Sequence, residues 1–109
     1  MNQQPNYDEA VRAYVTHLEG THTKWARPLG LRDMAIFSVV HSGKCTKIVF
    51  NDPPPEFDFP HSFIVRGDDP KFENGDILSS QSKTRPYRRS RLGNIFKPRS
   101  YRRIDWAAA

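Results

Sequence analysis

The sequence predicts an α+β fold, in which an N-terminal helix packs on a small antiparallel sheet that could close into a barrel. Two observations predict this class. Apolar residues recur at helical spacing near the N-terminus, and runs rich in β-branched and aromatic residues follow, separated by turn signals. A third observation, a change of charge after residue 76, predicts a basic C-terminal segment. We therefore expect an α+β domain over residues 1–80 and a basic segment over residues 81–109 that docks partly on it.

The first predicted element is a helix over residues 7–18. Its apolar residues follow one another at spacings that place them on one helix face. They are Tyr7, Ala10, Val11, Tyr14, Val15 and Leu18. Asn6 can cap the first turn and Gly20 can end the helix. Residues 21–32 have no clear period, so we expect a loop that anchors on the core through Trp25.

A β-hairpin is predicted next, with strands over residues 34–41 and 44–50 joined at Ser42-Gly43. This turn would pair Phe37 with Ile48 and would place one face of the hairpin on the core. The residues of that face are Ala35, Phe37 and Val39 on the first strand and Thr46, Ile48 and Phe50 on the second.

Two more strands are expected over residues 62–66 and 76–80, and the Asn74-Gly75 pair is a strong turn signal before the second of them. Near the C-terminus, residues 94–97 or 101–106 could add a further strand. Such a strand would hold arginines in rows on one face of the sheet.

Charge is distributed unevenly along the chain. Residues 1–76 contain eight basic and eleven acidic residues, whereas residues 77–109 contain nine basic residues and one acidic residue, Asp105. An excess of positive charge confined to about thirty residues attracts anions and raises the rate of encounter with them. The C-terminal end should therefore meet an anionic partner.

The basic segment contains a short repeat. Arg85-Pro86-Tyr87-Arg88-Arg89 recurs in looser form as Lys97-Pro98-Arg99-Ser100-Tyr101-Arg102-Arg103. Arginine binds phosphate oxygens and stacks through its flat face, and a tyrosine ring stacks on an unpaired base, so the pattern suits single-stranded nucleic acid. The candidate nucleic-acid-binding residues are Lys83, Arg85, Tyr87, Arg88, Arg89, Arg91, Lys97, Arg99, Tyr101, Arg102 and Arg103.

Three partners fit these arginines. The first is RNA or single-stranded DNA, as in a ribonucleoprotein or a phage- or virus-encoded protein. The second is an acidic protein surface, which would make the chain a small inhibitor or adaptor of the anti-defence type, with prolines 53–55 as an extra docking strip. The third is the chain's own acidic loops, residues 52–58 and 68–76. A solvated basic tail that has no partner and serves only solubility is the remaining alternative. Phosphate contacts would give the first partner a steep salt dependence.

One stretch resembles a known catalytic family. Phe63-Ile64-Val65-Arg66-Gly67-Asp68-Asp69-Pro70, followed by Gly75-Asp76-Ile77-Leu78, resembles the active-site strand and turn of the serine–lysine self-cleaving repressors related to signal peptidases. In that family a serine nucleophile, followed by methionine, comes directly after the Gly-Asp pair. Here that position holds Asp69, followed by Pro70, and the lysines that follow are Lys83 and Lys97. The nucleophile is missing, so we expect no peptidase activity.

Other catalytic constellations are equally weak, and we expect no enzymatic activity, no cofactor and no metal. The four histidines, His17, His22, His41 and His61, lack the spacing of a zinc-binding helix pair, and there is one cysteine. Cys45 with the nearby His41 could form a nucleophilic pair, but a half-buried strand cysteine is more often structural. A metal-dependent nuclease could use Asp68, Asp69, Glu73 and Asp76 with Lys83. A turn rich in aspartate explains these carboxylates more simply.

The expected setting is intracellular, cytoplasmic or nuclear. A single cysteine cannot form an internal disulfide, and residues 1–6 lack the layout of a secretory signal. No apolar run approaches the length that spans a bilayer, so we expect a protein that is neither secreted nor bound to a membrane.

Overall fold

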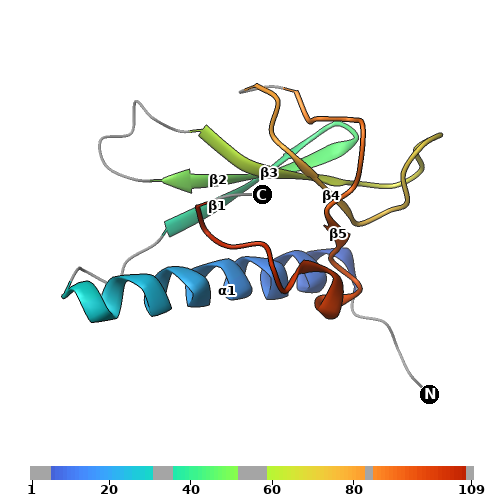
Figure 1. The fold of residues 1–109 in the computed structure, drawn as a ribbon. Helices are drawn as coiled ribbons and strands as arrows, with labels where there is room; N and C mark the ends of the chain where they lie inside the picture. Colours follow the sequence, from blue (N-terminus) through green and yellow to red (C-terminus); the bar gives the residue numbers. More distant parts are fainter. Residues whose placement is uncertain (1–5, 31–35, 52–58, 83–84, 108–109) are drawn as a thin grey trace, which may run out of the picture.

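The protein, in a computed structural model that describes residues 6–30, 36–51, 59–82 and 85–107, is one helix packed on a five-stranded antiparallel sheet. The helix is α1 (Tyr7–Ala26), and the strands are β1 (Ile36–Ser42), β2 (Cys45–Asn51), β3 (Phe59–Val65), β4 (Asp76–Ser79) and β5 (Gly93–Asn94). Two short 3-10 turns complete it, η1 (Arg27–Leu29) and η3 (Pro98–Tyr101). The strands follow the order β1-β2-β3-β4-β5, and α1 lies across one face of the sheet (Figure 1). The predicted α+β class is confirmed, but the sheet is open and does not close into a barrel.

Helix α1 begins where the sequence predicts and ends later. The Asn6 side chain accepts a hydrogen bond from Glu9 N at 2.8 Å, as an N-cap does. The helix then continues through Gly20 to Ala26, so the prediction of a loop from residue 21 is wrong for this stretch. A glycine inside a helix costs about 1 kcal/mol, which tertiary packing of the following turns can outweigh. Trp25, expected on the core, keeps 45% of its surface exposed.

The hairpin forms with a register shifted by two residues from the prediction. Gly43 has φ of 60° and the turn is Gly43-Lys44, so Phe37 pairs with Phe50 and Val39 pairs with Ile48. A positive φ at the first central position alone is the type II′ geometry that strand twist favours. Because side chains alternate with a period of two, a shift of two leaves each residue on its predicted face. Ile48 is fully buried, which confirms the core face of this strand, but Val39 at the sheet edge is 42% exposed.

Strands β3 and β4 also lie where the sequence predicts, with β3 extended at its start. The ladder between β2 and β3 changes register between Ile48 and Val49, opposite Ser62 and Pro60, so His61 is an extra residue in β3. Proline has no backbone N–H for a ladder, and it is found at such bulges. A bulge can turn a side chain in a new direction, and His61 reaches the C-terminal segment from here.

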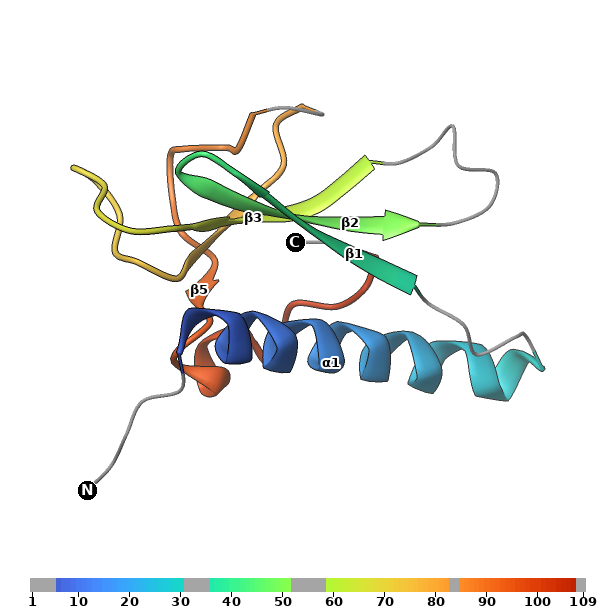
Figure 2. The same cartoon turned by 180° about the vertical axis from the view of Figure 1, so that it is seen from behind.

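Both faces of the sheet are buried in part. On the face toward α1, helix residues such as Tyr14 and Leu18 pack with Ile48, Ile64 and Ile77. This cluster also includes three residues of the C-terminal segment, which are Ile95, Tyr101 and Ile104. On the opposite face, a second cluster forms among Phe63, Val65, Phe72 and Leu78, with Cys45 against it. The segment around residues 85–91 lies on that side, away from α1, whereas the chain from residue 66 to 75 extends beyond one end of the sheet (Figures 1 and 2).

Of the two predicted C-terminal strands, neither forms as expected. Gly93 and Asn94 make the short strand β5, which pairs with Ile77 and Asp76 of β4. Residues 101–106 are not a strand, because the chain enters η3 and then docks on α1. Ala35 and prolines 53–55 lie outside the described residues.

Candidate nucleic-acid interface

The first half of the basic segment runs along the edge of β4 that faces away from β3, leading into the short strand β5. Tyr87 N donates to Ser79 O at 2.8 Å, and Leu92 N donates to Ile77 O at 2.7 Å. The two donors are five positions apart while their acceptors are two apart, so residues 88–91 bulge out of the edge. This Arg88–Arg91 bulge carries three arginines on the side of the sheet away from α1 (Figure 1).

Arg88 anchors one end of the bulge to the acidic turn. Its Nη2 donates to both carboxylate oxygens of Asp69 at 2.9 Å, and its guanidinium lies 5.2 Å from the centre of the Phe72 ring. Lys71 Nζ donates to the backbone carbonyl of Arg88. The backbone N–H of Lys71, which bonds Asp69 Oδ1, and the Arg88 guanidinium hold the pKa of Asp69 below its usual value.

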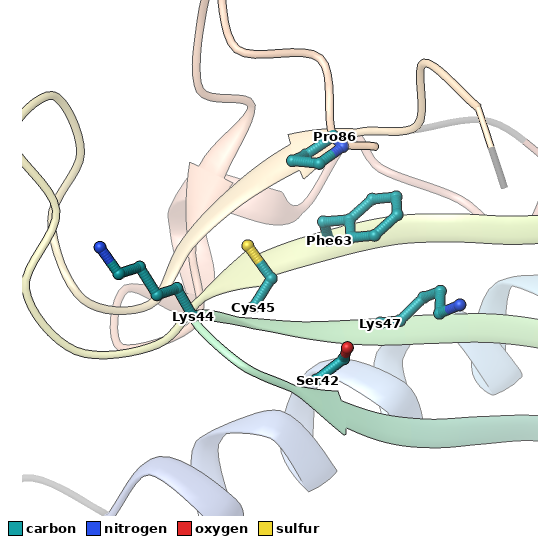
Figure 3. Close-up of a pocket in the computed structure, with 6 residues that line it drawn as sticks. All are labelled: Ser42, Lys44, Cys45, Lys47, Phe63 and Pro86. Carbon is teal, nitrogen blue, oxygen red and sulfur yellow. The ribbon is translucent and has the colours of Figure 1, made fainter. Parts of the chain in front are cut away.

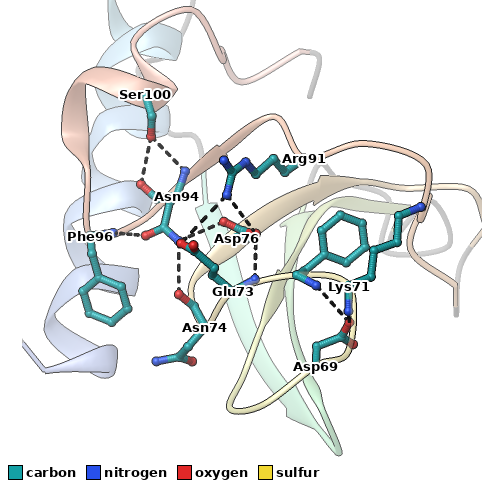
Figure 4. Close-up of polar contacts among 10 residues, drawn as sticks. Asp69, Lys71, Glu73, Asn74, Asp76, Arg91, Asn94, Phe96 and Ser100 are labelled. Carbon is teal, nitrogen blue, oxygen red and sulfur yellow. Dashed lines mark hydrogen bonds and ion pairs between the residues drawn. The ribbon is translucent and has the colours of Figure 1, made fainter.

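Arg91 anchors the other end at a buried carboxylate (Figure 4). Its Nη1 lies 3.6 Å from Oδ2 of Asp76, which has no exposed surface, and 3.8 Å from Oε2 of Glu73. Asp76 also accepts hydrogen bonds from Glu73 N and from Asn94 Nδ2, both at 2.9 Å. The side chain of Asp76 therefore ties the turn before β4, the bulge and β5 together.

These two ion pairs correspond to one of the three predicted partners. The acidic stretch 68–76 does receive arginines of the basic segment, through Arg88 and Arg91. Within the described part of the chain, Arg85 and Arg89 are exposed and make no ion pair, and Tyr87 between them is 37% exposed.

The second half of the basic segment lies on the other layer, beside α1. Tyr101 is only 4% exposed, and its ring centre lies 5.1 Å from those of Tyr14 and His17. It is a core residue, so its assignment as a stacking platform for a base is wrong. Its cationic neighbours are exposed and, among the described residues, form no ion pair. They are Lys97, Arg99, Arg102 and Arg103, and we call them the helix-side group.

Hydrogen bonds to side chains fix the end of the chain on the helix and on β3. The Ile104 carbonyl lies 2.7 Å from His17 Nε2, and Trp106 N donates to Thr21 Oγ1 at 2.9 Å. His61 Nε2 lies 2.6 Å from the Asp105 carbonyl, which can only accept, so the neutral ring carries its proton on Nε2.

The rest of that polar chain follows from the same tautomer. Nδ1 of His61 must accept from the hydroxyl of Ser62 at 3.0 Å, and Ser62 Oγ then accepts from the Tyr14 hydroxyl at 2.9 Å. Burial lowers the pKa of His61 and raises the pKa of Tyr14, so both groups keep the neutral form that this chain requires.

The expected rows of arginines on one face of the sheet are therefore not formed. The segment around residues 85–91 lies on the side of the sheet away from α1, whereas residues 97–103 lie next to α1 (Figures 1 and 2). The tract folds back at β5 because Gly93 and Asn94 pair with β4 and lead the chain to the other layer. Lys83 lies outside the described residues.

Two lysines that the sequence interpretation left out of the site lie near its first half. Lys44 and Lys47 belong to the β1–β2 hairpin, and they line one pocket with Pro86 of the basic segment. With Arg85 and Arg89 they make up what we call the sheet-side group. The alternation of side chains along the strand could have indicated Lys47. Cys45 and Lys47 occupy the hairpin face opposite the one that carries the buried Thr46 and Ile48.

The catalytic alternatives do not assemble in the described part of the chain. Cys45 pairs with Ser42 and lies on the face away from α1, whereas His41 bonds Thr46 Oγ1 on the opposite face, so the proposed Cys–His pair is not formed. Among the described residues no group of three or more His, Cys, Asp or Glu side chains could hold a metal ion. Asp69, at the position of the family's serine, is bonded to Arg88.

No protein-family model, no curated protein and no solved structure matches this chain. Within the residues that the structure describes, neither α1 nor a shorter helical turn has the length and apolar character of a membrane-spanning helix.

Proposed function

We propose that this protein binds single-stranded nucleic acid, RNA or DNA, through the sheet-side group, with the helix-side group as a second contact. The observation that carries the proposal is that seven cations of these two groups are exposed and form no ion pair within the described residues. They are Lys44, Arg85, Arg89, Lys97, Arg99, Arg102 and Arg103.

Exposed cations without an ion pair bind phosphates most readily. Each contact releases a counterion, and no ion pair within the protein has to be broken first. The Arg88–Asp69 and Arg91–Asp76 pairs support the proposal in another way. They fix the bulge, so Arg89 is presented from a chain whose two ends are tied down. Fixing a contact segment before binding reduces the entropy that is lost on binding.

Single strands fit better than a duplex. Tyr87 offers a half-exposed ring between Arg85 and Arg89, and stacking on aromatic rings needs unpaired bases. A cytoplasmic or nuclear setting, where such strands occur, is part of the proposal.

The test is fluorescence-anisotropy titration of labelled single-stranded RNA, single-stranded DNA and duplex DNA of equal length, at low and moderate salt. We expect the single strands to bind more tightly and binding to weaken steeply with salt. The double variant Arg85→Ala/Arg89→Ala should lose most of this binding.

The matched control is Arg12→Ala/Lys24→Ala, which removes two exposed cations from α1 and leaves both groups intact. It should bind like the wild type. If neither protein binds any strand at low salt, the proposal is wrong, and an acidic protein surface becomes the partner to test by pull-down. Equal losses of affinity in the two double variants would mean that binding depends on the net charge of the protein and not on a specific site.

A further inference from the structure

A pocket of about 210 Å³ opens on the face of the sheet away from α1. It lies where the β1–β2 hairpin, β3 and the basic segment meet (Figure 3). Its lining residues are Ser42, Lys44, Cys45, Lys47, Phe63 and Pro86.

The lining combines an apolar centre with polar groups. Phe63 forms the apolar floor and is only 4% exposed, so its ring offers almost no face to a ligand, and Pro86 of the basic segment forms one wall. The Cys45 thiol and the Ser42 hydroxyl lie on the same side of the sheet as Phe63 and Pro86, while the Lys44 and Lys47 side chains extend away in different directions (Figure 3). The cations thus flank the pocket and do not fill it.

The backbone holds the two sides of the pocket together. Pro86 is fixed by a bridge to Ser80 and by the hydrogen bond of the next residue, Tyr87, to Ser79 O. On the other side, Lys47 pairs with Phe63 in the ladder between β2 and β3. The pocket is therefore a built feature of the sheet and of the segment that carries Arg85 and Arg89.

The size selects a small, flat ligand. A volume near 210 Å³ corresponds to about seven water molecules at about 30 Å³ each, below the range of about 300–1,000 Å³ typical of drug-sized ligands. An apolar centre with one hydroxyl at its side and cations at its rim matches a single base with its phosphates.

We propose that the pocket holds one unpaired nucleobase of the bound strand, with the base inserted beside Pro86, Cys45 and Ser42 and the adjacent phosphates at Lys44 and Arg85. This inference rests on the proposed function and sharpens it, because it names where a base is held. The Ser42 hydroxyl can donate to or accept from a base edge, which suits more than one base. Paired bases cannot enter, so the pocket gives a reason for single-strand preference.

Cys45 makes the pocket directly testable, because it is the one cysteine in the sequence and lines the pocket. We would measure the rate at which N-ethylmaleimide alkylates the wild-type protein at pH 8.5, free and saturated with single-stranded oligonucleotide. A base in the pocket should slow the reaction by about ten-fold or more. A duplex of equal length and an abasic oligomer of equal charge, both at saturation, should leave the rate within about two-fold of the free protein.

The result separates the pocket from the proposed function. If anisotropy shows the single strand bound while the alkylation rate is unchanged, the base pocket is wrong and nucleic-acid binding stands. If nothing binds, both fail. Protection by the abasic oligomer equal to that by the single strand also overturns the pocket, because phosphates alone would then cover the thiol.

A filled pocket provides a second readout that does not depend on thiol reactivity. Ser42→Trp adds a large ring beside the space at an exposed hairpin position and changes no charge. Loss of the base contact should weaken single-strand binding by about ten-fold and leave duplex binding unchanged. Thr16→Trp, at an exposed position of α1 outside both cationic groups, is the control for added aromatic surface. Equal affinity of Ser42→Trp and the wild type for single strands would contradict the base pocket.

Discussion

The two Tyr-Arg-Arg triplets have the same sequence and different surroundings. Tyr87 is 37% exposed, in an extended segment along the edge of β4, whereas Tyr101 is 4% exposed and packs on Tyr14 and His17. Their arginines differ too, since Arg88 bonds Asp69 while Arg102 and Arg103 make no ion pair among the described residues. A repeated motif therefore does not predict a repeated role, because the element that carries it decides which side chains reach solvent.

The largest difference should appear in stability. Tyr101→Ala removes a buried ring between α1 and η3, so it should lower the free energy of unfolding by about 3 kcal/mol. Tyr87→Ala at the exposed position should lower it by no more than about 0.5 kcal/mol. Urea denaturation of the two variants measures both. Equal losses would contradict the distinction between the triplets.

A smaller loss is expected at the carboxylate that fixes the first triplet's segment. Asp76→Asn keeps the shape but sets an amide donor against N–H donors from Glu73, Asn94 or Arg91, so we expect a loss of about 2 kcal/mol. Asp68→Asn, at an exposed position in the same acidic turn, is the control and should be near neutral. A neutral result for Asp76→Asn in urea denaturation would mean that the network does not stabilise this edge.

As the pH falls, the C-terminal residues 104–106 and the acidic turn that contains Asp69 should lose stability in different pH ranges. The pKa of His61 is lowered by burial, so the unfolded chain binds more protons below about pH 6.5, and the stability from neutral His61 is lost as pH falls through that range. Asp69, whose pKa is lowered by the Lys71 N–H and by Arg88, loses its contribution to stability only as the pH falls below 3.8, the usual pKa of an aspartate.

Hydrogen exchange measured between pH 7.5 and 4.5, corrected for its intrinsic pH dependence, checks this order. Amides of residues 104–106, which His61 holds through Asp105, should lose protection first, while Lys71 N, bonded to Asp69, keeps its protection. His61→Gln should flatten the loss above pH 5. Loss of protection at Lys71 before residues 104–106 would contradict the assignment.

The smallest effect separates two arginines within one triplet. Arg89 is exposed without an ion pair among the described residues, whereas Arg88 already bonds Asp69. Arg89→Ala should weaken single-strand binding by about five-fold, equivalent to about 1 kcal/mol. Arg88→Ala should weaken it less, because its charge is largely neutralised by Asp69. Anisotropy titrations at one salt concentration compare them, and a larger loss for Arg88→Ala would reverse the assignment.

Much of the fold was predictable from local signals. The periodic spacing from Tyr7 to Leu18, the Asn6 cap and the alternation of the hairpin located α1 and its buried face and the two strands. Local signals failed where tertiary contacts decide. Gly20 is a helix breaker in isolation, but His22 and Ala26 are buried in the turns that follow it.

The site was harder to predict for the same reason. The sequence shows that the C-terminal segment is basic, but it does not show which of its side chains are exposed. Tyr101 is buried against Tyr14, which is 87 positions earlier in the chain. The pairing of Arg88 with Asp69, and the approach of Lys44 and Lys47 to Pro86, also need the complete sheet. No local pattern in the sequence carries such distant contacts.

The central claim is that three exposed cations of the sheet-side group, Lys44, Arg85 and Arg89, bind the phosphates of a single strand. The most direct test is the slope of log affinity against log salt for the wild type and for Arg85→Ala/Arg89→Ala. Each phosphate contact on a single strand contributes about 0.7 to the slope, so the double variant should bind with a slope shallower by about 1.4. An unchanged slope, with Arg12→Ala/Lys24→Ala equal to both, would contradict the claim.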